Sequence, residues 1–194
     1  MALGGGGMKP RLAIVLVHYP VLDRQSEVVT TAITNLDLHD IARSAYTYDV
    51  DQFIVVHPVE AQRRLALRVR EHWVEGSGAR RIPDRKPPMT RLSVVASFDE
   101  AVAGLRPQVE LWATSASPNR ATLGYAQARQ RLSSGNGTVA IIFGTGWGLA
   151  PAVFERATHV LEPISSCRSD GYNHLSVRAA AAIMLDRLLS RDGR

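Results

Sequence analysis

The stretch that decides the fold is Arg11–His18, which reads RLAIVLVH and is continuously apolar and rich in β-branched residues. A strand of this kind is buried on both faces, as at the centre of a parallel sheet. Comparable apolar runs predict five further strands, at Gln52–Pro58, Leu92–Ala96, Val109–Thr114, Val139–Phe143 and His159–Ile164.

Helical segments separate these strands. We predict helices at Ser26–Tyr46, Glu60–Val74, Phe98–Leu105, Ala121–Ser133 and Asn173–Leu189, with Ser97 and Asn173 as N-caps, and a loop at Ala79–Thr90. This alternation predicts an α/β fold with a mostly parallel open sheet and helices on both faces. No linker interrupts it, so we expect one domain over residues 11–194, preceded by a flexible tag or linker at residues 1–10 that contains four consecutive glycines.

The composition is that of an ordinary globular protein, with 194 residues, 45% hydrophobic and 21% charged. The apolar runs are far shorter than the roughly 18–20 residues that a membrane span requires, so no membrane contact is expected. Cys167 is the only cysteine, which excludes an internal disulfide and favours the cytoplasm. We treat this cysteine as incidental because no neighbouring base is identifiable.

The formal net charge is +5, and basic residues outnumber acidic ones between residues 60 and 91. Guanidinium groups pair with phosphate oxygens, so this segment is a candidate RNA contact, above all at Arg80, Arg81, Arg85 and Lys86. A solvated surface is the alternative interpretation.

A glycine-rich segment, Gly144–Leu149 (GTGWGL), directly follows a predicted strand. Ligands of open α/β sheets bind at the carboxyl ends of the strands, and glycines allow a ligand to approach the backbone. The third glycine is misplaced for a dinucleotide fingerprint, and no Lys-Ser or Lys-Thr follows, which excludes a P-loop. A second distinctive segment, Leu161–Ser176, is a polar loop that leads into an alanine-rich helix.

Together, Gly144–Leu149 and Leu161–Val177 resemble the SPOUT superfamily of RNA methyltransferases, and the resemblance runs over most of the chain. It implies a C-terminal trefoil knot, S-adenosylmethionine as cofactor, a tRNA or rRNA substrate, and a homodimer formed through the C-terminal helix region. The site is then shared between the subunits. The residues expected to line the cofactor are Thr114, Ser115, Ala116, Gly144, Thr145, Gly146, Trp147, Gly148, Leu149, Ile164, Asn173, His174, Leu175 and Ser176.

A third segment, Asn35–Ala45, resembles the first motif of the SpoU-like branch, in which an asparagine precedes a catalytic arginine. The matching residues are Arg43 and Asn35, although Asp37 stands where the asparagine belongs. An arginine near the methyl acceptor would position an RNA phosphate. Pairing of Arg43 with Asp40 or Asp49 is the alternative.

Methyl transfer requires no metal, and the histidines lack metal-ligand spacing, so no metal site is predicted. The candidate general bases are Asp37, Asp40, Asp170, His39 and His174. Two other functions stay open: a non-catalytic module that binds the cofactor or RNA, and a Rossmann-like or flavodoxin-like protein that holds a nucleotide phosphate at Gly144–Gly148. The RNA, the nucleotide and the methylated atom are not predicted.

Overall fold

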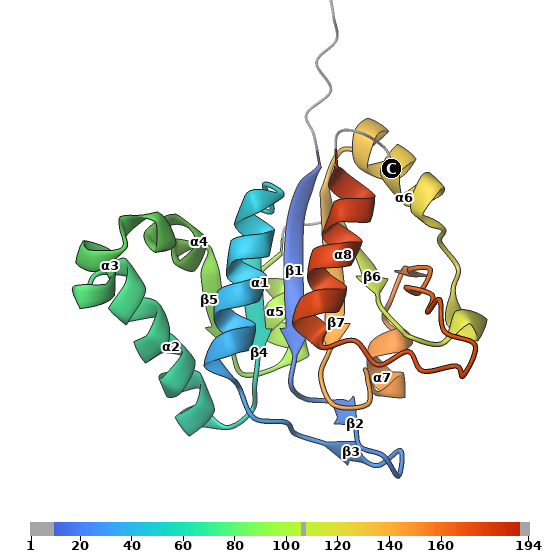
Figure 1. Ribbon diagram of the computed structural model, residues 1–194, viewed down its shortest axis with the longest axis horizontal. Helices are drawn as coiled ribbons and strands as arrows, with labels where there is room; N and C mark the ends of the chain where they lie inside the picture. Colours follow the sequence, from blue (N-terminus) through green and yellow to red (C-terminus); the bar gives the residue numbers. More distant parts are fainter. Residues whose placement is uncertain (1–9, 106–107, 191–194) are drawn as a thin grey trace, which may run out of the picture.

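The computed structural model describes residues 10–105 and 108–190, and its centre is a six-stranded parallel sheet (Figure 1). The strand order is β5-β4-β1-β7-β6-β8. These strands are β1 (Arg11–Val17), β4 (Gln52–Val56), β5 (Leu92–Val95), β6 (Val109–Ala113), β7 (Thr138–Gly144) and β8 (His159–Val160). The predicted α/β class and parallel sheet are confirmed. The predicted linker lies outside the described residues except for Pro10.

Helices cover both faces of the sheet, as predicted. One face packs against α1 (Asn35–Thr47), α2 (Glu60–Val74), α4 (Lys86–Thr90), α6 (Tyr125–Ser134) and α8 (Val177–Leu189), and the other against α5 (Phe98–Ala103) and α7 (Pro151–Phe154). Strand β1 serves both layers, because Leu12, Ile14 and Leu16 face the first while the alternate residues face the second. Its continuous apolar run is therefore explained by burial on two sides.

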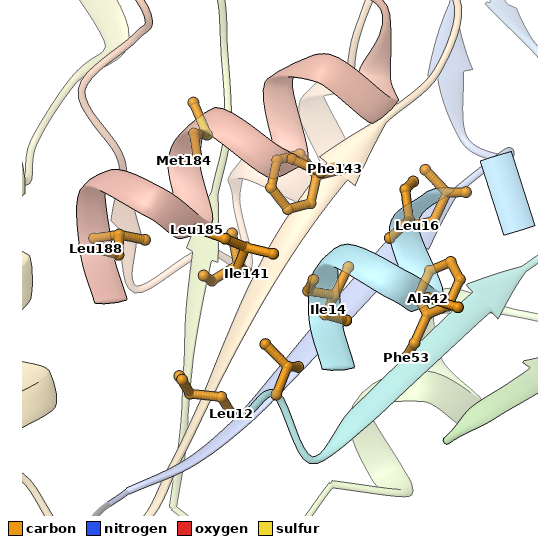
Figure 2. Packing of buried hydrophobic residues seen from close by; sticks show 14 of the residues in the cluster. Leu12, Ile14, Leu16, Ala42, Phe53, Ile141, Phe143, Met184, Leu185 and Leu188 are labelled. Carbon is orange, nitrogen blue, oxygen red and sulfur yellow. The ribbon is translucent and has the colours of Figure 1, made fainter. Parts of the chain in front are cut away.

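Helix α8 lies beside α1 across the centre of the sheet. Figure 2 shows Met184, Leu185 and Leu188 of α8 in the same cluster as Ile141 and Phe143 of β7. All five side chains are at least 97% buried. The Tyr48 hydroxyl just after α1 donates to the Asp186 carboxylate of α8 at 2.8 Å, which adds a polar tie between the two helices.

The predicted helix over Ser26–Tyr46 is wrong in its first part. Strand β3 (Val28–Val29) stands there and forms a small antiparallel hairpin with β2 (Val21–Leu22), and α1 begins only at Asn35 with Thr34 as N-cap. Valines are stiff at χ1 and favour strands. Ser26 turns the chain with a left-handed backbone, φ +67°.

The predicted loop over Ala79–Thr90 is also wrong, because it contains α3 (Ser77–Arg81), η1 (Pro83–Arg85) and α4. The prolines that suggested a loop stand in first helical turns, where no N–H is needed. In the same way η2 (Pro118–Arg120) and α7 each begin with proline and were not predicted.

The last two of the predicted helices begin later than expected. Helix α6 starts at Tyr125, and α8 starts at Val177 because Ser176, not Asn173, is its N-cap. The Ser176 hydroxyl accepts from the amide of Ala179 at 3.3 Å. Within the described residues no helix is long and apolar enough to span a membrane.

Candidate functional site

A cavity of about 870 Å³ opens at the carboxyl ends of β6 and β7. Three segments that are distant in the sequence meet there: Thr114–Ser117 after β6, Gly144–Leu149 at the end of β7, and Asn173–Val177 leading into α8. Small-molecule sites measure roughly 300–1,000 Å³, so the volume suits a cofactor with room beside it. All fourteen residues expected to line a cofactor line this cavity. That they bind it stays a prediction.

The glycine-rich loop is shaped by close contact with β2. Gly146 has φ +60°, and a Cβ there would lie 2.8 Å from the carbonyl oxygen of Leu22. The Trp147 amide donates to that same carbonyl at 2.9 Å, and the Leu22 amide donates to Gly148 at 2.9 Å. Glycine is therefore required at position 146 by both its backbone angle and its neighbour.

A chain of hydroxyls fixes the loop from beneath. The Thr145 hydroxyl donates to the Val17 carbonyl at 3.1 Å, so it must accept from the Thr31 hydroxyl. The Thr31 hydroxyl in turn accepts from Nδ1 of His18, 3.0 Å away. These hydrogen bonds link the end of β1 to the cavity wall through two threonines.

His18 and His57 form a buried pair beneath these hydrogen-bonded threonines, with ring centroids 5.6 Å apart. The Val59 amide donates to Nδ1 of His57, so Nε2 carries the proton and donates to the Thr31 carbonyl at 2.9 Å. Burial, reinforced by His57, lowers the pKa of His18 from 6.5 to about 4. Burial also lowers the pKa of His57. Both rings are therefore neutral near pH 7.

An ion cluster joins α1 to α8 at the cavity. The Arg178 guanidinium lies 3.0 Å from Asp37 and 3.4 Å from Asp40. Asp37 also accepts from the Thr34 hydroxyl at 2.6 Å and is only 6% exposed. Asp37 lines the cavity while its charge is balanced by Arg178, which makes it a structural anchor as well as a candidate base.

The predicted catalytic pair does not line the cavity of its own chain. Asn35 and Arg43 are exposed on α1. The alternative of an Arg43–Asp40 pair is not observed, since Asp40 contacts Arg178. The catalytic assignment stays a prediction.

The other candidate bases are dispersed. His39 is buried edge-on against Trp73, 5.1 Å between centroids, and burial, with Arg85, lowers its pKa. Asp170 lies outside the cavity, and the Arg168 guanidinium beside it lowers its pKa. His174 lines the cavity. Residues 10–105 and 108–190 contain no cluster of three His, Cys, Asp or Glu side chains suited to a metal.

Sequence reasoning missed several lining residues, namely Leu22, Thr31, Ala32, Ser117, Arg120, Phe143, Phe154, Val177, Ala180 and Met184. Arg120 and Ser117 could have been found, because they follow the predicted strand before β7 and so lie at the carboxyl edge of the sheet. Thr31 carried no local signal, since its segment was predicted to be helical.

The predicted basic segment lies at the β5 edge of the sheet, away from α7 and the beginning of α8, where the cavity opens (Figure 1). Several of its arginines are used within the chain: Arg64 pairs with Glu60 at 3.2 Å, and Arg85 stacks 4.9 Å from the Trp73 ring centre. Arg80 and Arg81 at the end of α3 remain exposed. RNA contact by this segment stays a prediction.

Comparison with known proteins gives a family match. Residues 11–190 match the family described as SAM-dependent RNA methyltransferase. A protein named tRNA (guanine-N(1)-)-methyltransferase from Oleidesulfovibrio alaskensis is 41% identical over 184 residues, which is 92% of this chain but 42% of that protein. The chain therefore spans less than half the length of this relative.

Two further proteins are similar to this chain, over different shares of their own lengths. An uncharacterized protein of Aquifex aeolicus is 35% identical over 185 residues, covering 92% of this chain and 88% of that protein. The SpoU methyltransferase AviRb from Streptomyces viridochromogenes, solved with AdoMet, superposes with a TM-score of 0.58 at 13% identity, over 96% of this chain and 60% of that one. At this identity the second similarity concerns the fold alone.

The buried His18 makes stability sensitive to acid. Its pKa is about 4 in the folded chain and 6.5 when unfolded, so the unfolded state binds more protons between these values. The contribution is fully present above pH 6.5 and is lost as the pH falls to about 4, amounting to about 3 kcal/mol. We expect the free energy of unfolding, measured with urea, to fall as the pH is lowered from 6.5 to about 4.

The matched control is His18→Asn, which keeps a donor toward Thr31 but does not titrate. We expect a shallower pH dependence for this variant, with the remaining slope due in part to His39 and His57, whose pKa values are also lowered. Equal slopes for the two proteins between pH 4 and 6.5 would show that His18 is not the sensitive group.

Proposed function

The chain belongs to the SAM-dependent RNA methyltransferase family, and we propose that it transfers a methyl group from S-adenosylmethionine to RNA as a homodimer. Membership confirms the predicted family, whose description names the predicted cofactor and reaction. That this chain carries out the reaction is the proposal. The observation that carries the proposal for this chain is the meeting of three distant segments around one cavity at the carboxyl edge of the sheet.

The residues around the cavity fit the cofactor. Leu149, Ile164 and Leu175 supply apolar walls for the adenine, and a Cβ added at Gly148 would meet no described atom within 4 Å, so the loop leaves space there. The Thr114 hydroxyl donates to the Ile142 carbonyl at 2.9 Å and holds the remaining wall in place. We infer that these residues bind and orient the methyl donor.

When bound, S-adenosylmethionine supplies a methyl group on a positively charged sulfur. The bond from carbon to the RNA acceptor forms as the bond to sulfur breaks, and the acceptor's proton leaves. The task of the protein is therefore to align two reactants and to exclude water. The His174 ring or the Asp37 carboxylate at the cavity wall is available to take the proton.

Arg43 is the proposed catalytic arginine, with Asn35 about two turns earlier on α1. Arg43 does not line the cavity of its own chain, so its proposed role is at a site to which a second subunit contributes. This position supports the proposed homodimer and a shared site, in which Arg43 binds a phosphate of the RNA at the partner's cavity.

The proposed dimer contact is the outer side of α8. Ala179, Ala182 and Ile183 are half-buried and share one stripe of the helix. Small side chains allow a second copy of the helix to approach closely. Continuity of this stripe with the cavity through Ala180 is in keeping with a shared site.

We also propose the trefoil knot, with the segment before α8 passing through the connection between β6 and α6. The supporting observation is that Leu161 forms a parallel bridge with Leu123 of this connection before the chain returns to the centre of the sheet. A crystal structure with bound S-adenosylmethionine tests the threading directly. The proposed substrate is tRNA or rRNA in the cytoplasm; guanine N1 is not carried over, because that relative is matched over 42% of its length.

Cofactor binding is tested by calorimetry with S-adenosylhomocysteine. We expect saturable binding to the wild type and none detectable with ATP, NAD or FMN. Gly146→Val should abolish it, because its Cβ would meet the Leu22 carbonyl at 2.8 Å, whereas Gly78→Ala at a distant crowded glycine serves as the control for general destabilisation. Preference for a phosphate-bearing cofactor would contradict the proposal.

The role of Arg43 is tested by single-turnover methylation of bulk RNA. Arg43→Ala should lower the rate about tenfold to a hundredfold, the cost of a lost charge-assisted hydrogen bond, and leave S-adenosylhomocysteine affinity unchanged. Mixing Arg43→Ala with Gly146→Val should restore about a quarter of the wild-type activity, because half of the exchanged dimers hold one complete site. An unchanged rate would show that Arg43 is not catalytic, and no methylation by the wild type would favour a non-catalytic module. Absence of restoration would exclude a shared site.

The dimer is tested by sedimentation. We expect a wild-type dimer, and Ala182→Glu should give a monomer because a carboxylate would be buried between two helices. The control is Ala126→Glu, which makes the same change at an exposed position of α6. A monomeric wild type, or a dimer that tolerates Ala182→Glu but not Ala126→Glu, would rule out contact through α8.

A further inference from the structure

Three aromatic rings form a cluster at the mouth of the cavity. The His174 ring lies between Trp147, 5.8 Å away, and Tyr172, 5.3 Å away, and both contacts are edge-on. Trp147 and Tyr172 are each 59% exposed, more than any other Trp, Tyr or Phe side chain among the described residues. Large rings held in water next to a cavity indicate a binding surface.

The position of Tyr172 is set by the loop that carries it. The Asp170 carboxylate accepts from the Tyr172 amide at 3.1 Å and from Nε of Arg168 at 2.9 Å. Gly171 between them has φ +75°, a backbone angle that side chains rarely adopt. The tyrosine ring is thus presented by a defined turn that places it against His174.

A guanidinium without an ion pair lines the same cavity. Arg120 is exposed, and its guanidinium lies 4.6 Å from the ring centre of Phe154, which also lines the cavity. Among residues 10–105 and 108–190 no carboxylate pairs with it. The aromatic ring fixes this cation while leaving its donors available to an anion.

We propose that Tyr172 and Trp147 stack on a nucleobase of the substrate RNA and that Arg120 binds the adjoining phosphate. The inference rests on the proposed function, since it places an unstacked nucleotide beside the methyl donor. Proteins hold single-stranded bases on aromatic rings and pair their phosphates with arginine. The cavity volume of about 870 Å³ leaves room for part of a nucleotide beside the cofactor.

The test measures affinity for a 15-nucleotide single-stranded RNA and for an abasic strand of the same length and charge, with S-adenosylhomocysteine saturating. We expect the wild type to prefer the base-containing strand about tenfold, the usual effect of one stacked base. Tyr172→Ala should remove this preference, while Tyr172→Phe retains it because the ring is kept. Arg120→Gln should weaken binding of both strands and reduce the salt dependence by about one ion.

The control is Tyr19→Ala, which removes another exposed ring, 42% exposed and outside the cavity, and should change neither affinity. Equal wild-type affinities for the two strands, or an unchanged preference in Tyr172→Ala, would overturn the proposal. So would conversion of a dimer to a monomer by Tyr172→Ala, because the rings would then contact a second copy of the chain. Retained binding of S-adenosylhomocysteine in any of these cases separates this failure from a failure of the proposed function.

Discussion

The return of α8 to the middle of the sheet is the constraint on which the site depends. Met184, Leu185 and Leu188 are buried against β7 and its neighbours. Truncating any one of these side chains to alanine would lower the free energy of unfolding by roughly 2–5 kcal/mol. Because β8 is at the edge of the sheet, the chain must cross from there to the centre before α8 begins. The crossing segment is thereby held against the end of β7, and a cavity forms between them.

The sheet could be predicted because its signal is local. Strand β1 is buried by helices on both faces, so one uninterrupted apolar run in the sequence indicates its position. The glycine-rich loop could be placed because parallel strands end on the same edge, which brings together whatever follows β6 and β7. All fourteen lining residues chosen from the sequence follow or precede elements whose positions this rule determines.

Features that depend on tertiary contacts could not be predicted in this way. The β2–β3 hairpin exists because Leu22 bonds to the loop after β7, more than a hundred residues later. Thr31 reaches Thr145 through the same arrangement. Asp37 is held by Arg178 across 141 positions of sequence. A local sequence pattern indicates whether a segment is a helix or a strand, but not which distant segment it contacts. This explains both the wrong helix prediction at Ser26–Tyr46 and the missed lining residues of the cavity.

The site has a lining that combines glycines, short hydroxyls and apolar side chains, and a rim of exposed aromatic side chains. The hydroxyls of Thr145 and Thr114 donate to carbonyls of the chain, and that of Ser176 accepts from an amide, so these hydroxyls hold the lining in shape and carry no charge. A cationic donor therefore meets no fixed charge from them. Discrimination among the RNA atoms that accept the methyl group must then come from side chains that extend beyond the lining. There a substitution changes contacts with the RNA without disturbing the fold.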